Sequence, residues 1–232
     1  MKVLLIGDSF GLERVHSGGG KVATNETWPH LVMNHFNNEK IDFEIDFEGF
    51  RRIVECPAII EKKNKLFDVI IIQAGIVDCF TRPLGIKLSK NQSLISKIIR
   101  RLVRVFRKEW MLYFNSVQWS SKNEIENAIK NLVKYGNKTG FVSCCPISLS
   151  QAINSPGAQE KLIEFNASIQ KFVETDDNFF MIRPDLAFLK RDYTDYIHPK
   201  DSHFNVKGNE MMSALVIHQL NIHFKEIKTT AN

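Results

Sequence analysis

The chain has 232 residues, 44% of them hydrophobic and 25% charged, and carries a formal net charge of +5. These values are typical of one globular domain that is large enough to bury a full core. No apolar run is long enough to span a membrane, and the amino terminus lacks the basic and apolar segments of a secretory leader, which predicts a cytoplasmic location.

Strand-like and helix-like patterns alternate along the chain. Strands are expected at about residues 2–6, 41–47, 68–74, 139–145 and 178–183. Helices are expected at about residues 27–37, 51–64, 93–109, 123–136, 158–175 and 206–224. The third strand run, 67–73, is almost continuously apolar, as in a parallel strand that is covered on both faces. This alternation predicts right-handed crossovers and a three-layer α/β/α sandwich.

Two stretches exceed a minimal version of such a fold, although we interpret residues 1–232 as one domain. Residues 11–25 include Gly18, Gly19 and Gly20 and are expected to form a flexible loop. Residues 81–121, approximately, lie between the third strand and its crossover helix. We interpret them as an insertion at the carboxyl edge of the sheet, where they form a lid or an acyl-group pocket, or only pack their aromatic side chains.

The insertion contains a strongly basic segment. Within residues 97–108, basic side chains interleave with apolar ones at helical spacing. The pattern predicts an amphipathic helix with a solvated basic face; the alternatives are docking to an anionic membrane surface or to an acidic polymer. No motif resembles a nucleic-acid-binding one, so we expect no nucleic acid partner.

The chemistry-bearing residues are concentrated near the two ends of the chain. The apolar run 2–6 stops at Gly7-Asp8-Ser9, which places the Ser9 hydroxyl at the carboxyl edge of a sheet, where ligands bind in open α/β folds. Asp201 and His203 lie close together just before the terminal amphipathic stretch. A serine at one end with an acid and a base at the other indicates acyl transfer by a serine nucleophile.

These two segments resemble the SGNH (GDSL-type) hydrolase/esterase family, in which a Gly-Asp-Ser block follows the first strand and an Asp/His block precedes the last helix. The resemblance implies a flavodoxin-like sheet of five parallel strands. It also implies that Ser9 and a glycine after the second strand, here Gly49, supply oxyanion-hole amides. Gly75-Ile76-Val77-Asp78 aligns with the family's Gly-x-Asn-Asp block, but Val77 replaces the oxyanion asparagine.

Valine donates no side-chain hydrogen bond, and loss of one oxyanion donor costs serine hydrolases on the order of 3 kcal/mol. Arg82 is our candidate substitute, because its guanidinium can serve an oxyanion or an anionic substrate group. An equally simple role for Arg82 is to pair with Asp78.

Two histidines compete for the role of base. Asp195 and His198 have the family's Asp-x-x-His spacing, whereas His203 has the family's sequence context, because Phe-Asn-x-x-Gly and the last helix follow it. We favour His203, oriented by Asp201, and keep Asp195 and His198 as the fallback acid and base. In an extended segment, residues two apart point to the same side, which would let Asp201 reach the His203 ring.

We expect neither a metal nor a cofactor. Cys56, Cys79, Cys144 and Cys145 form no CxxC pair or zinc-like spacing, so they are expected to be reduced structural thiols. A zinc site built from Asp195, His198, Asp201 and His203 has suitable ligand types but would leave Ser9 unexplained.

The sequence therefore predicts a serine esterase or acyl-transferring enzyme that acts on a small-molecule or glycan ester. Family habits favour an O-acetyl group on a carbohydrate. Two alternatives stay open: an inactive relative that binds a glycan or partner, which Val77 favours, and a lipase or thioesterase that docks to membranes through the basic helix.

Overall fold

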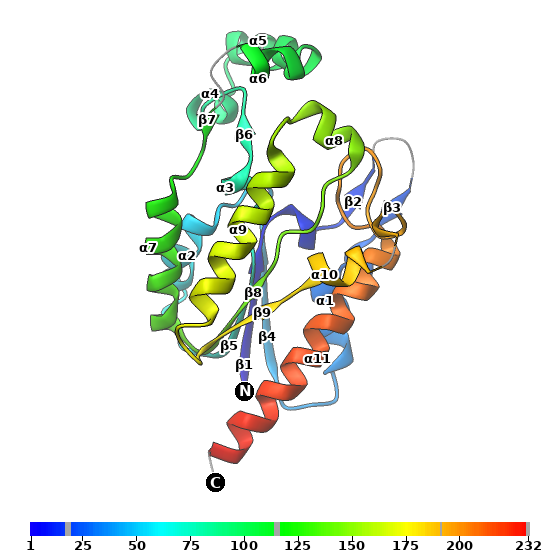
Figure 1. The fold of residues 1–232 in the computed structure, drawn as a ribbon. Helices are drawn as coiled ribbons and strands as arrows, with labels where there is room; N and C mark the ends of the chain where they lie inside the picture. The colour runs from blue at the N-terminus through cyan, green and yellow to red at the C-terminus, as the bar shows by residue number, and fades with distance from the viewer. Residues whose placement is uncertain (17–19, 114–116, 191, 231–232) are drawn as a thin grey trace.

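The structure is a computed structural model that describes residues 1–16, 20–113, 117–190 and 192–230 (Figure 1). Its centre is a sheet of five parallel strands in the order β4-β1-β5-β8-β9. The strands are β1 (Lys2–Gly7), β4 (Asp42–Phe47), β5 (Phe67–Gln73), β8 (Gly136–Val142) and β9 (Phe179–Ile182). All five predicted strands are therefore present, in the flavodoxin-like order that the family resemblance implied.

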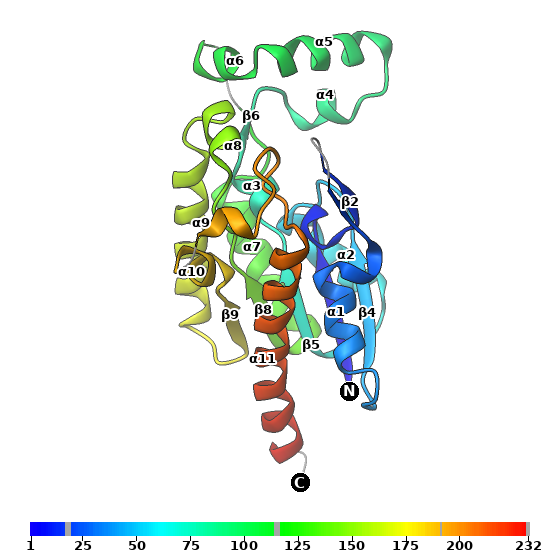
Figure 2. The ribbon, with the colours of Figure 1, turned by 90° about the vertical axis from the view of Figure 1, so that its right-hand side faces the viewer.

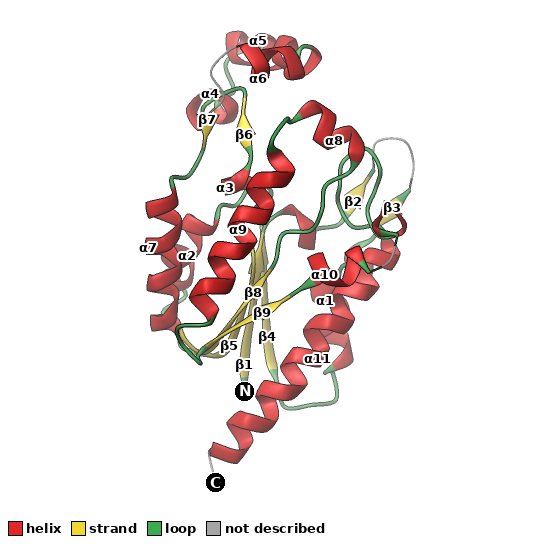
Figure 3. Cartoon of the chain, viewed as in Figure 1, coloured by secondary structure: helices red, strands yellow, loops and turns green. Residues whose placement is uncertain are grey.

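Helices cover both faces of the sheet, which confirms the three-layer sandwich (Figure 3). One face carries α2 (Cys56–Lys62), α7 (Lys122–Leu132) and α9 (Ala158–Val173). The other carries α1 (Trp28–His35), α10 (Pro184–Leu189) and α11 (Val206–Thr230). The last helix packs closely along α1, so the two ends of the chain are neighbours on this face.

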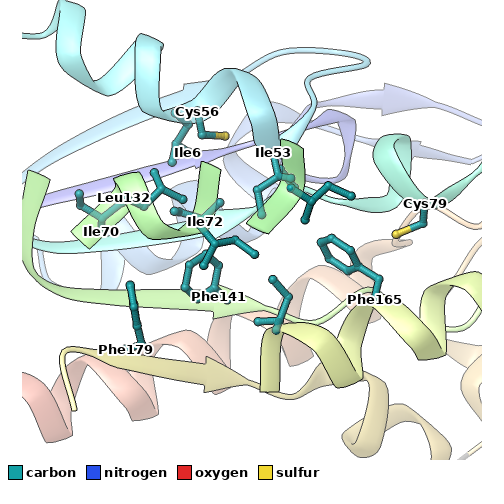
Figure 4. Close-up of a cluster of buried hydrophobic side chains, with 14 of the residues drawn as sticks. Ile6, Ile53, Cys56, Ile70, Ile72, Cys79, Leu132, Phe141, Phe165 and Phe179 are labelled. Atoms are coloured by element: carbon teal, nitrogen blue, oxygen red, sulfur yellow. The ribbon is translucent and has the colours of Figure 1, made fainter. Parts of the chain in front are cut away.

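The central strands supply both cores because their side chains alternate between the faces. From β1 and β5, one face receives Leu4, Ile6, Ile70 and Ile72, which belong to the same core as Phe141, Phe165 and Phe179 (Figure 4). The opposite face receives Val3, Leu5, Val69 and Ile71. All these side chains from β1 and β5 are at most 2% exposed. The continuous apolar run of β5 is thus explained by burial on two sides.

The segment after β1 is more ordered than a simple loop. A 3-10 turn, η1 (Ser9–Gly11), is followed by the short antiparallel strands β2 (Arg14–Val15) and β3 (Lys21–Val22) and by η2 (Thr24–Glu26). Of the predicted flexible glycines, Gly18 and Gly19 lie outside the described residues. A flexible loop over all of 11–25 is wrong, because paired backbone occupies part of that range.

The predicted insertion leaves and re-enters the body through the antiparallel pair β6 (Thr81–Arg82) and β7 (Val117–Gln118), after a short α3 (Ile76–Cys79). It contains α4 (Ile86–Lys90), α5 (Leu94–Val105) and α6 (Arg107–Tyr113). In Figures 1 and 2 these helices lie beyond the carboxyl edge of the sheet, at the end opposite to both chain termini. The single helix expected at 93–109 is divided in two at Phe106.

The remaining described elements are η3 (Ile53–Glu55), η4 (Val133–Tyr135), α8 (Leu149–Asn154) and η5 (Tyr193–Asp195). None of the described helices is long and apolar enough to cross a bilayer. All four cysteines are free thiols, and Cys56, Cys79 and Cys145 are buried.

Candidate active site

Ser9 lies on a tight turn directly after β1. Asp8 caps this turn, since its carboxylate accepts a hydrogen bond from the Phe10 amide at 3.0 Å. A Cβ added at Gly7 would lie 2.4 Å from the carbonyl oxygen of Gln73 on β5, so only glycine fits where the chain leaves the sheet. The turn therefore fixes the Ser9 hydroxyl at the carboxyl edge of the central strands.

The His203 ring meets that hydroxyl. Ser9 Oγ and His203 Nε2 are 2.9 Å apart although the two residues are separated by 194 positions in the chain. The ring of Phe10 stacks on the imidazole, with centroids 4.6 Å apart. A serine beside an imidazole nitrogen at this distance is the arrangement that allows proton transfer from the hydroxyl.

Asp201 contacts His203 through a left-handed turn. Ser202, between them, has φ of +60° and its hydroxyl accepts a hydrogen bond from the Ser148 amide at 2.7 Å. The Asp201 carboxylate accepts from the His203 amide at 3.1 Å and lies 3.5 Å from Nδ1. Our expectation of an extended segment was wrong: the turn, held by Ser148, brings the carboxylate and the ring together.

Arg14 is a member of this cluster that we did not identify from the sequence. Its Nη1 lies 3.1 Å from His203 Nε2, and its Nε donates to Asp201 Oδ2 at 3.1 Å. A guanidinium is only a donor, so Nε2 must carry the lone pair and Nδ1 the hydrogen. The Nδ1 atom accordingly lies 3.0 Å from the backbone carbonyl oxygen of Asp201. This tautomer leaves Nε2 ready to accept a proton. The sequence feature that could have indicated Arg14 is that it is the one arginine within residues 11–25, the segment after Ser9.

The Asp201 carboxylate is kept ionised by its partners. Burial acts to raise the pKa of Asp201, but hydrogen bonds from the ring and amide of His203, together with that from His16, outweigh burial and hold this pKa well below its usual value. A permanent negative charge beside the imidazole stabilises the imidazolium that proton transfer creates.

Ser9, His203 and Asp201 line one pocket of about 310 Å³. Val77, Arg82 and Phe50 also line it. A larger hollow of about 930 Å³, lined mainly by side chains of α7 and α9, has neither Ser9 nor a histidine in its lining, so the smaller pocket is the one that holds the Ser9–His203 pair.

Comparisons with known proteins identify the fold. No protein-family profile matches the chain, and no curated protein matches its sequence. Solved structures that match at TM-scores of 0.59–0.60 include a lipase/acylhydrolase from Enterococcus faecalis (16% identity, 94% of each chain covered) and a variant of an acetyl xylan esterase from Geobacillus stearothermophilus (16%, 94% of this chain and 93% of that chain). They also include a carbohydrate acetylesterase family member from Sinorhizobium meliloti (14%, 96% of this chain and 99% of that chain). A structure from Veillonella parvula, described as a member of the lipolytic G-D-S-L family, matches at 0.58 with 12% identity, covering 94% of this chain and 96% of that chain. The chain has the SGNH hydrolase fold.

Within the SGNH fold, the fallback acid and base lie away from Ser9. Asp195 is exposed in η5, and the hydrogen bond that it accepts among the described residues, from Asn205, is at its backbone carbonyl and not at its carboxylate. The His198 ring stacks on His16 at 4.4 Å, and neither it nor Asp195 lines the pocket with Ser9. The structure thus brings His203 to the serine and not His198.

The residues that would hold a metal also differ from those we weighed. Among the described residues, His16, His198 and Asp201 can present ligand atoms within 4.8 Å of one another. However, the Arg14 guanidinium already contacts Asp201 Oδ2, which places a fixed positive charge where the cation would be bound.

Two positions that we expected at an oxyanion hole, Val77 and Gly49, differ in their surroundings. Val77 is buried against the pocket, and Gly49 is exposed on the loop after β4, beside the pocket-lining Phe50. Asp78 accepts hydrogen bonds from the Ile53 amide and the Ser120 hydroxyl. Among the described residues Asp78 forms no ion pair with Arg82, although its charge raises the pKa of that arginine, so the pairing that we considered is present only as a longer-range attraction.

Proposed function

We propose that the chain is a serine esterase that cleaves or transfers an O-acyl group. The observation that carries the proposal is the contact between Ser9 Oγ and His203 Nε2, at 2.9 Å, inside a pocket of the SGNH fold. The carboxylate of Asp201 orients the ring and stabilises its protonated form. This set of residues supports catalysis by a triad without a cofactor.

In the proposed reaction, the Ser9 oxygen bonds to the acyl carbon while His203 Nε2 takes the hydroxyl proton. The bond from the acyl carbon to the alcohol oxygen then breaks, and His203 returns the proton to the departing alcohol. Water, or an acceptor hydroxyl, attacks the acyl-enzyme with the same proton route in reverse. The amides of Ser9 and Gly49, with Arg82 as a further donor, are the groups that we propose for the oxyanion.

An O-acetyl group on a carbohydrate is the substrate that we favour. Two of the matching structures are described as a carbohydrate acetylesterase family member and an acetyl xylan esterase. The pocket of about 310 Å³ suits a short acyl chain better than a long one. We propose that the chain forms one domain, whose insertion at about residues 81–121 contributes Arg82 and Arg107 to the wall of this pocket. The cytoplasmic location stays a prediction from the sequence.

A fluorophosphonate probe tests the mechanism directly, because it forms a covalent bond only with an activated serine. We expect labelling at Ser9, loss of labelling in Ser9→Ala, and at least about a hundredfold slower labelling in His203→Ala. The matched variant His198→Ala should label at close to the wild-type rate. Turnover of 4-nitrophenyl acetate should follow the same order.

Labelling at another residue, or equal loss in both histidine variants, would contradict the assignment of nucleophile and base. A protein that resists the probe but binds acetylated glycans with Ser9→Ala unchanged would be the inactive binding module that Val77 favours.

We also propose that α5 docks to an anionic membrane surface. Its apolar side chains Leu94, Ile95, Ile98, Leu102 and Val105 are all more than half exposed. Lys97 and Arg101 on the same helix, and Lys108 in the first turn of α6, are also exposed. An acidic polymer would use the charges alone, whereas a bilayer surface also accepts the apolar face.

A further inference from the structure

The pocket that contains Ser9 is unusually rich in positive charge. Four basic residues line it, namely Arg14, Arg82, Arg107 and Lys200, against one acidic residue, Asp201. Neutral esters present no group that needs such a lining. The contacts of these basic residues show which of them are already paired with a carboxylate.

The negative charge of Asp201 is shared among the basic groups that contact its carboxylate. Its carboxylate bonds to Arg14, to His16 and to His203. Arg82 and Arg107 are not among these partners. Within the part of the chain that the structure describes, neither of these two arginines forms an ion pair with a carboxylate.

Arg82 is held by aromatic faces. Its guanidinium carbon lies 4.4 Å from the ring centroid of Trp119 and 5.7 Å from that of Phe50. Rings stabilise the flat faces of a guanidinium but do not accept its in-plane N–H groups as carbonyls or carboxylates do. Its Nε is buried and has no hydrogen-bond partner among the described residues. Burial, and then the charge of Arg107, lower the pKa of Arg82 to about 10, against the smaller opposing effects of the Asp78 and Asp8 charges.

Arg107, the first residue of α6, is anchored by uncharged groups. Its Nε donates to the Asn154 carbonyl at 3.1 Å, and its Nη2 donates to the Ser155 hydroxyl at 3.0 Å. Burial lowers the pKa of Arg107 as well. Two partly buried guanidinium groups in one pocket, neither of them in an ion pair among the described residues, favour an anion that joins them.

We infer that Arg82 and Arg107 form an anion clamp for the substrate, which is therefore an ester that bears a carboxylate or phosphate group close to the acyl bond. The planar donor fork of arginine matches both anions. The inference rests on the proposed esterase function for its position beside Ser9. A transient oxyanion occupies one site during the reaction, whereas two resident cations match a negative charge that the substrate carries from the start.

Two pairs of esters, matched in shape, test this clamp. Mono-(4-nitrophenyl) glutarate is compared with 4-nitrophenyl pentanoate for an anion on the acyl side, and 4-acetoxybenzoate with its methyl ester for an anion on the alcohol side. We expect kcat/KM to favour the anionic member of at least one pair by about tenfold or more.

The variants Arg82→Gln and Arg107→Gln should each lower that preference by about 10- to 100-fold, and Arg82→Lys should restore part of it. Lys225→Gln removes the same charge from the exposed face of α11 and should leave the preference unchanged. If Arg82 served only the oxyanion, both members of a pair would slow equally and the preference would remain, which would overturn the inference.

Calorimetric titration of the Ser9→Ala protein with glutarate and with inorganic phosphate gives a readout independent of turnover. Binding of either anion that is weakened about tenfold or more in Arg107→Gln supports the clamp, and the anion bound identifies the substrate group. Failure of fluorophosphonate labelling with anion binding intact would remove the esterase function and keep the anion site. No anion binding and no substrate preference would remove the clamp and leave the esterase function standing.

Discussion

Keeping Asp8 ionised at neutral pH costs folding free energy, because its carboxylate is buried. It is fully buried, and its Oδ2 has no partner among the described residues. Burial raises the pKa of Asp8 from 3.8 to about 7, against the lowering effect of the hydrogen bond from the Phe10 amide. Asp8 caps the turn that holds Ser9, so its protonation couples the stability of the fold to the residue next to the nucleophile.

Asp8→Asn should make stability less dependent on pH. Between pH 3.8 and about 7 the folded chain binds the Asp8 proton and the unfolded chain does not, so wild-type stability falls as pH rises through this window. The amide of asparagine stays neutral, and its oxygen can still accept from Phe10. We expect urea unfolding to show the variant gaining up to about 3 kcal/mol over wild type between pH 4.5 and 8.

The exposed Asp177→Asn change should give a difference from wild type that is small and constant with pH. A constant difference for Asp8→Asn as well would mean that Asp8 stays ionised when folded.

At the residue scale, residues in local sequence motifs could be predicted, whereas contacts between distant segments of the chain could not. Ser9, Asp201 and His203 stand in short sequence blocks with recognisable flanks, so they could be selected before their distances were known. The positive φ of Ser202 depends on Ser148 from a distant segment, and the contact of Arg14 depends on the pairing of β2 with β3. Neither of these two contacts produces a periodic pattern in the sequence.

At the element scale, long elements were predicted well because burial imposes a period on them. All five sheet strands and the main helices lie within a few residues of their expected bounds. The short α3, α4, α8 and α10 and the strand pair β6/β7 were missed, because elements of two to six residues are too brief to show a period. The division of 93–109 at Phe106 was missed for the opposite reason, since the apolar period continues across it.

The exposed face of α5 leads to an element-scale prediction. Replacing Lys97, Arg101 and Lys108 by Glu should abolish co-sedimentation with vesicles of phosphatidylcholine and 30% phosphatidylglycerol, because each basic residue near such a surface contributes about 1 kcal/mol. Leu102→Gln with Val105→Gln should weaken the same binding at unchanged charge. Pure phosphatidylcholine vesicles should bind poorly.

The control replaces Lys122, Lys130 and Lys134, which are exposed on α7 and η4, by Glu. Equal loss in the control would indicate an effect of net charge alone. Wild type that ignores vesicles but binds polyglutamate would make an acidic polymer the partner.

At the scale of the whole molecule, the topology followed from the alternation of strands and helices, while the position of the insertion did not. Handedness rules restrict where a crossover helix packs. No such rule places the insertion, about residues 81–121, so its closeness to Ser9 through Arg82 and Arg107 required the structure.

The two cores on either side of the sheet lead to a prediction of stability. Ile71, on the central strand β5, is fully buried, whereas Ile163, on α9, is 60% exposed. Ile71→Ala should lower the free energy of unfolding by about 2–5 kcal/mol, and Ile163→Ala should change it by less than about 0.5 kcal/mol. Denaturant titration of both variants measures this, and similar losses at the two positions would contradict the packing.

The contact of Arg14 with His203 Nε2 sets an order of events for the proposed reaction. The imidazole offers one lone pair at that nitrogen, and a guanidinium shares it with the serine in the resting protein. Once protonated, the same nitrogen would face a cation across the same gap and repel it. In the proposed reaction, the Arg14 N–H group therefore competes with Ser9 for the lone pair of Nε2, and it must turn away as that nitrogen takes the proton.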